Sequence, residues 1–156
     1  MRRALLALLV VLVAGGAWIA YTERWRHGGD TPIGFRAMPG GLDGAELANP
    51  VFLRFRKRKY LESYLAQHAR GRVPPLPAID WARDEVLLAA VGARSSTGYA
   101  VGIGSVSDQR SRIVVRVRET APALGQPVAA RVTYPYALAT IPQSPKRVHF
   151  IWVGRP

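Results

Sequence analysis

The run Val86-Leu87-Leu88-Ala89-Ala90-Val91 contains six consecutive apolar residues and no charge. Acidic residues, Asp84 and Glu85, precede it, and Gly92 follows it. A short apolar run with such boundaries is typical of a strand that is buried on both faces, in the middle of a sheet. We therefore expect residues 86–91 to form the central strand of the protein.

Strand patterns and one helical pattern flank this run. Alternating apolar residues predict strands in the following ranges: 34–38, 51–56, 99–104, 112–118, 128–133, 136–141 and 148–153. Residues 58–69 carry Tyr60, Leu61, Tyr64, Leu65 and His68 at helical spacing. About seven strands and one helix result, and the strands after residue 80 follow one another without a helix between them. This order favours an α+β fold, a mainly antiparallel sheet, half-open barrel or sandwich with the helix packed on one side.

The N-terminal segment is uncharged from Ala4 to Tyr21 and follows Arg2 and Arg3. As a helix it would rise about 27 Å, close to the thickness of a bilayer core. Small residues at 14–17 resemble a signal-peptide cleavage site, but the hydrophobic run continues past them. We expect an uncleaved transmembrane anchor in residues 1–21, a linker in 22–32 and a domain in 33–156. The domain would then face the periplasm or the exterior of a bacterial inner membrane, or be secreted if the segment is cleaved.

Length, cysteine content and net charge limit the kinds of site and partner that this protein can have. The 156 residues provide for one domain with a core, and the absence of cysteine excludes a disulfide framework, a thiolate metal site and a cysteine nucleophile. The formal net charge is +12, which is compatible with an acidic partner, an anionic membrane surface or nucleic acid. No RNA-binding signature accompanies the basic residues, and export would separate the domain from most nucleic acid, so we expect no nucleic-acid partner.

Residue sets for catalysis are missing from the sequence. The ten acidic residues occur mostly at predicted turns and element ends, so no pair is a candidate for acid and base catalysis. The three histidines have no metal-ligand spacing, and no nucleophile-elbow motif occurs. The sequence Gly102-Ile103-Gly104-Ser105 lacks the rest of a nucleotide-binding loop. We therefore expect a protein without catalytic activity, metal or cofactor, with an unrecognised hydrolase as the last-ranked alternative.

Two groups of residues are candidates for binding. The first is the densest basic run, Arg54, Arg56, Lys57, Arg58 and Lys59, which is either a solvated connection or a site for anionic lipid, cell-wall polymer or an acidic partner. The second combines a loop with a tyrosine-containing edge: Ser96, Thr97, Gly98, Tyr99, Tyr134, Pro135 and Tyr136. Glycine at 98 allows a positive φ in a tight turn. Exposed tyrosines are frequent anchors of protein interfaces, although packed tyrosines at simple turns remain the alternative.

Residues from about 79 to 153 resemble the C-terminal domain of the protease-complex-subunit PrcB family. The matching segments are Ile79-Asp80-Trp81, Val86 to Gly92, Thr97-Gly98-Tyr99, Ile113 to Glu119 with Ala121-Pro122, Thr133 to Tyr136, and Ala137 to Ile141. Residues 33–78 fit the same family more loosely. The family loop usually reads Pro-Thr-Gly-Gly-Tyr, whereas this chain has Ser95-Ser96-Thr97-Gly98-Tyr99 and so lacks one glycine.

This resemblance implies an extracytoplasmic accessory protein, since the family's namesake associates with a secreted subtilisin-like protease. Many members are lipoproteins, but a chain without cysteine would depend on residues 4–21 for attachment. The leading hypothesis is thus a membrane-tethered module that binds a protein, for example a secreted protease, through the loop of residues 94–99 and the edge of residues 134–136. The alternative is an envelope protein that binds anionic lipid or cell-wall polymer through residues 54–59.

Overall fold

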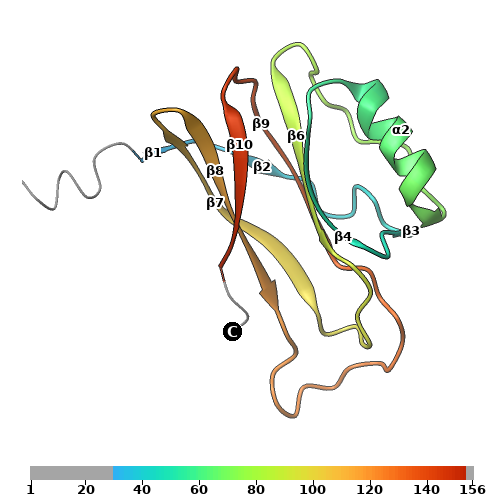
Figure 1. The fold of residues 1–156 in the computed structure, drawn as a ribbon. Coiled ribbons are helices and arrows are strands. Elements are labelled where there is room, and N and C mark those ends of the chain that lie inside the picture. The colour runs from blue at the N-terminus through green and yellow to red at the C-terminus, as the bar shows by residue number, and fades with distance from the viewer. Residues whose placement is uncertain (1–29, 154–156) are drawn as a thin grey trace, which may run out of the picture. The chain divides into compact units, whose positions relative to one another are not determined.

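The computed structural model describes residues 30–153, which contain three sheets and one helix (Figure 1). Sheet 1 has the strand order β1 (Thr31–Pro32), β7 (Ala100–Gln109), β8 (Arg112–Thr120), β10 (Arg147–Trp152). Sheet 2 has the order β2 (Arg36–Ala37), β9 (Tyr136–Pro142), β6 (Asp84–Val91), β4 (Pro50–Phe55). The remaining elements are the strand pair β3 (Ala45–Glu46) and β5 (Arg70–Gly71) and the helix α2 (Arg58–His68).

Strand β6 lies inside sheet 2, between β9 and β4, and both of its faces are covered. Val86, Leu88 and Ala90 belong to the apolar cluster that includes the buried side of helix α2. Leu87 and Ala89 belong to a second cluster that sheet 1 completes. Because side chains alternate along a strand, a strand between two packing layers must be apolar at every position. The prediction of a central strand buried on both faces is confirmed.

Helix α2 covers the outer face of sheet 2 (Figure 1). Leu61 and Leu65 are its buried residues, and the ring of Phe55 at the end of β4 lies 5.5 Å from that of Tyr64. The sequence predicted residues 58–69 as the helix, and the structure confirms it with bounds of Arg58 and His68. Tyr60, one of the residues at helical spacing, is not buried with Leu61 and Leu65 but is 53% exposed.

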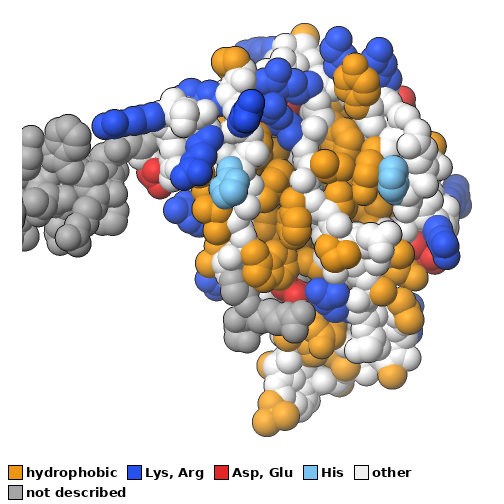
Figure 2. Space-filling view, viewed as in Figure 1, with side chains coloured by type: hydrophobic (Ala, Val, Ile, Leu, Met, Phe, Trp, Pro, Cys, Tyr) orange, Lys and Arg blue, Asp and Glu red, His pale blue; other side chains and the backbone are white. Residues whose placement is uncertain are grey.

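The two sheets are open along one side, where β4 and β10 are the outer strands of their sheets. The ring of Phe52 on β4 lies 5.9 Å from the rings of both Phe150 and Trp152 on β10. Figure 2 shows hydrophobic side chains gathered between these strands, with Lys and Arg concentrated along the upper rim. Aromatic packing therefore closes this side in place of main-chain hydrogen bonds, and the predicted mainly antiparallel α+β fold with one packed helix is confirmed.

Several details of the sequence prediction were wrong. The described residues contain ten strands rather than about seven, and four of them (β1, β2, β3 and β5) have only two residues. Residues 128–133 form no strand, because Val128 and Val132 are exposed and no neighbouring strand pairs with them beyond one bridge between Arg94 and Thr133. Strand β10 pairs with β8 in parallel, which the predicted antiparallel order did not include. After β9, residues 143–146 lead the chain from sheet 2 to sheet 1, where β10 lies beside β8.

The predicted anchor at residues 1–21 lies outside the described residues. Within residues 30–153 we find no helix that is both long enough and apolar enough to cross a membrane. Thr31 and Pro32, at the end of the predicted linker, form β1 and pair with β7.

Candidate functional site

A groove of about 510 Å³ lies between the first half of β7 and the first half of β9. Five of the seven residues predicted for protein binding line it: Thr97, Tyr99, Tyr134, Pro135 and Tyr136. Apolar residues of β7, of β9 and of the segment 35–38 also line the groove: Phe35, Ala37, Met38, Val101, Ile103, Ala137, Leu138 and Ala139. The fold thus brings together two segments that are more than 30 residues apart in the sequence.

The two segments are joined by hydrogen bonds between main-chain groups and by two that involve threonine hydroxyls. Arg94 and Thr133 exchange two of them, with N···O distances of 2.8 and 2.9 Å. The Thr97 amide donates to the Ala129 carbonyl, and the Ala129 amide donates to the Thr97 hydroxyl, both at 3.1 Å. The Thr133 hydroxyl donates to the carbonyl of Ser96, which is 9% exposed and does not line the groove. The hydrogen bonds of Ser96 and Thr97 therefore hold the loop against residues 129–133.

Gly98 is needed for a different reason from the one that the sequence suggested. It does not have a positive φ, which the neighbouring Gly92 does have, at 78°. A Cβ at position 98 would instead lie 2.5 Å from Pro122 Cβ and 2.6 Å from Val128 Cγ1. Only glycine permits this approach, so Gly98 packs the loop against residues 122–128 rather than forming a tight turn.

A buried ion pair anchors the start of the loop. The guanidinium of Arg94 donates to both carboxylate oxygens of Glu119 on β8, and Glu119 is 1% exposed. Arg94 also donates to the carbonyls of Val91 and Ala93, at 2.8 and 2.9 Å. The hydrogen bond with Glu119 raises the pKa of Arg94, so the guanidinium remains charged.

The sequence placed Arg94 in the candidate binding loop but did not identify its pairing with Glu119, although a signal for Glu119 was present. Glu119 falls on the same alternation as Ile113, Val115 and Val117, which are all buried. A carboxylate that continues the buried side of a strand requires a partner in the interior. The partner itself could not be found from spacing, since it is 25 residues away in the loop after β6.

Tyr136 is half-buried, and its hydroxyl is hydrogen-bonded within the fold rather than free at a strand edge. It begins β9, where it pairs with Ala90 of β6. Its hydroxyl accepts a hydrogen bond from the Leu42 amide at 2.8 Å and donates one to Asp43 Oδ1 at 2.9 Å. Burial, together with the nearby Asp43, raises the pKa of Tyr136 to about 12. Tyr136 therefore fixes the turn that forms one rim of the groove.

Replacing Tyr136 with Phe is expected to lower the free energy of unfolding by about 2 kcal/mol at neutral pH, because the buried Leu42 amide loses its partner. The raised pKa means that folding favours the neutral phenol. Its contribution is full below pH 10 and is lost as the pH rises from 10 through 12. Urea unfolding at pH 9 and pH 11 should show a smaller difference between parent and variant at pH 11. An equal difference at the two pH values would contradict this assignment.

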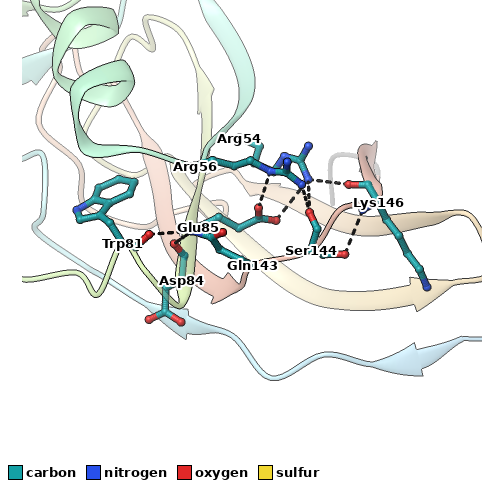
Figure 3. Close-up of polar contacts among 8 residues, drawn as sticks. All are labelled: Arg54, Arg56, Trp81, Asp84, Glu85, Gln143, Ser144 and Lys146. Carbon is teal, nitrogen blue, oxygen red and sulfur yellow. Dashed lines mark hydrogen bonds and ion pairs between the residues drawn. The ribbon is translucent and has the colours of Figure 1, made fainter.

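Two of the five basic residues in the run 54–59 pair with a buried carboxylate, and the other three do not. The guanidiniums of Arg54 and Arg56 lie 3.5 and 3.3 Å from the carboxylate of Glu85, which has no exposed surface (Figure 3). Arg54 also donates to the Lys146 carbonyl at 2.7 Å, and Arg56 donates to the Ser144 carbonyl. These contacts join β4, β6 and the segment before β10, so both arginines stabilise the fold.

The other three basic residues of the run are exposed. Arg58 pairs with Glu62 one turn further along helix α2, at 2.7 Å. The Lys59 ammonium lies 5.2 Å from the centre of the Tyr60 ring. Three of the five predicted anion-binding residues thus have a carboxylate partner within this chain, which leaves Lys57 and Lys59 as the remaining cations of the run.

Metal ligation has no candidate in the described residues, where no three His, Asp or Glu side chains are grouped closely enough to hold an ion. The groove itself contains one carboxylate, Asp43, and one cation, Arg131. Three tyrosines and a series of apolar side chains line it together with these two charges, a composition that is common in binding sites.

Comparison with known proteins agrees with the resemblance seen in the sequence. The family model described as PrcB C-terminal matches residues 86–142, which run from β6 through β7 and β8 to the end of β9. Neither the curated proteins nor the solved structures include a significant match. The matched range holds both strands that border the groove, together with Arg94 and Glu119. Residues 86–142 of this chain therefore match the PrcB C-terminal family, which confirms the resemblance.

Proposed function

We propose that this protein is a membrane-tethered, extracytoplasmic accessory module that binds a partner protein through the groove between β7 and β9. The observation that carries the proposal is that most residues lining the groove, including both bordering strands, belong to the segment that matches the PrcB C-terminal family. The family description supports a role in a protease complex, so we propose a secreted protease as the partner. Tethering through residues 4–21 rests on the length and hydrophobicity of that segment.

We further propose that the protein has no catalytic activity of its own and acts by holding its partner. The support is the lack of a catalytic residue set in the sequence and the apolar, tyrosine-rimmed character of the groove. Binding of anionic lipid or polymer through residues 54–59 is less well supported, because Arg54, Arg56 and Arg58 already have acidic partners.

Replacing Tyr134 with Ala is expected to reduce recovery of the partner about 30-fold, because aromatic anchors at the centre of an interface contribute about 2 kcal/mol. The measurement is affinity purification of the tagged full-length protein from its native membrane, with the bound proteins quantified by mass spectrometry. Tyr134 suits this test because its ring lines the groove, whereas Tyr136 has a structural hydroxyl.

The matched control is Tyr60→Ala, which removes a tyrosine that is 53% exposed on helix α2 and does not line the groove. It should leave the recovered proteins unchanged. Enrichment of a secreted protease with the parent and with Tyr60→Ala, but not with Tyr134→Ala, supports the proposal. Equal recovery with all three proteins would exclude the groove as the binding site.

A further inference from the structure

Strand β7 is paired along its whole length on one side only. On that side it pairs with β8 from Ala100 to Gln109. On the other side β1 pairs only with Ser107 and Asp108, and the Ile33 amide donates to the Val106 carbonyl at 2.9 Å. In the described part of the chain, residues 100–105 therefore have no strand neighbour on this second side. Unpaired main-chain N–H and C=O groups along a strand are a template for another strand.

This free edge borders the groove. Residues 100–103 line it on one side, and residues 136–139 of β9 line it on the other. Val101 and Ile103 are half-buried and contribute, with Ala137, to the apolar cluster between the sheets. A chain that entered the groove beside β7 would consequently meet main-chain hydrogen-bonding groups and an apolar base together.

The edge lacks most features that prevent strand addition. No lysine and no proline occurs between residues 100 and 105. Gly102 and Gly104 are exposed, and a Cβ built on Gly102 would have no atom within 4 Å. A bulge between Ile103 and Ser105 is the one irregularity. In contrast, the second half of the same edge is already covered by β1, with Pro32 at its end.

We propose that an extended segment of the partner protein adds to β7 as a further strand, paired with residues 100–105 within the groove. This inference rests on the proposed function and specifies its binding mode. Strand addition takes its affinity from main-chain hydrogen bonds and its specificity from alternate side chains. An edge of six residues corresponds to about 20 Å of strand, so five or six partner residues would pair.

The residues that line the groove indicate which side chains the added partner strand should carry. Every second side chain would face the apolar base near Val101 and Ile103 and should be apolar and of moderate size. Arg131 is exposed at the rim, whereas the carboxylate of Asp43 is occupied by the Tyr136 hydroxyl. With a formal net charge of +12 for the chain, we expect a segment that alternates apolar and polar residues and contains an acidic one.

The test uses a phage-displayed library of random ten-residue peptides, selected on the full-length protein in detergent. The tightest peptide is synthesised, and each of its amide nitrogens is methylated in turn. Because alternate amides of an added strand point toward its neighbour, methylation should weaken binding about tenfold at every second position and have little effect between them. Hydrogen exchange should slow in residues 100–105 of the complex.

Two further variants distinguish failure of the binding mode from failure of the proposed function. If methylation is tolerated at all positions but Tyr134→Ala still weakens binding and Tyr60→Ala does not, the groove binds proteins and strand addition is wrong. If the peptide binds the parent and Tyr134→Ala equally, or protects residues other than 100–105, both the groove and the strand addition are wrong. A selection that enriches no peptide would also overturn strand addition.

Discussion

Replacing Leu88 with Ala is expected to lower the free energy of unfolding by about 3 kcal/mol. Leu88 has no exposed surface and lies on the side of β6 that faces helix α2, in the cluster that contains Leu61 and Leu65. Removing its branched end leaves a cavity that neither the sheet nor the helix can fill without moving. Substitutions of this kind lose both the transfer free energy of the side chain and the contacts around the cavity.

Urea unfolding followed by circular dichroism would measure this loss. The matched control is Leu124→Ala, because Leu124 is 106% exposed in the connection before β9. The control should stay within about 0.5 kcal/mol of the parent. Equal stabilities for the parent and Leu88→Ala would mean that β6 does not separate two packed layers. At temperatures where the variant is folded, binding through the groove should be retained, since Leu88 does not line it.

Replacing Arg94 with Ala is expected to lower the free energy of unfolding by about 3 kcal/mol and also to abolish partner binding. The change removes both guanidinium hydrogen bonds to the buried carboxylate of Glu119 and the bonds to the carbonyls of Val91 and Ala93. Breaking a buried ion pair from one side is costly because the remaining charge stays in the interior. The same substitution releases the loop that presents Tyr99 to the groove.

Arg94→Lys tests the geometry of the pair, because an ammonium keeps the charge but cannot make two parallel bonds to a carboxylate. Its stability should lie between those of the parent and Arg94→Ala. Arg118→Ala serves as the control, since Arg118 is the exposed neighbour of Glu119 on β8. Unfolding curves for Arg94→Ala that coincide with those of the control would show that the pair has no structural importance.

Much of the fold could be predicted from local patterns. The apolar run 86–91 identified a strand covered on both faces, and the spacing of Leu61 and Leu65 identified the helix with its buried side. These patterns succeed because a strand or helix next to a core must match its side-chain period to that core. The prediction failed at residues 128–133, where the alternation of Val128 and Val132 matches no buried surface.

Local patterns also located some of the residues that line the groove. Tyr99 and Tyr134 both line the groove, because each lies next to the start of a strand, β7 and β9, that the sequence located within one residue. The role of Tyr136 was not predictable, since its hydroxyl bonds to Leu42 and Asp43, more than 90 residues away. Likewise, the interior pairing of Arg54 and Arg56 with Glu85 could not be distinguished from a solvated basic run.

Local patterns in the sequence were enough to locate the central strand, the helix and the longer strands β4, β7, β8, β9 and β10, because these elements depend on side-chain periodicity over a few neighbouring residues. Only the tertiary structure decided the parallel pairing of β10 with β8, the incomplete cover of β7 by β1, and hence the groove. Strand neighbours and ion-pair partners are selected by contacts between distant parts of the chain. Such contacts depend on how all the layers pack at once, and no local pattern records them.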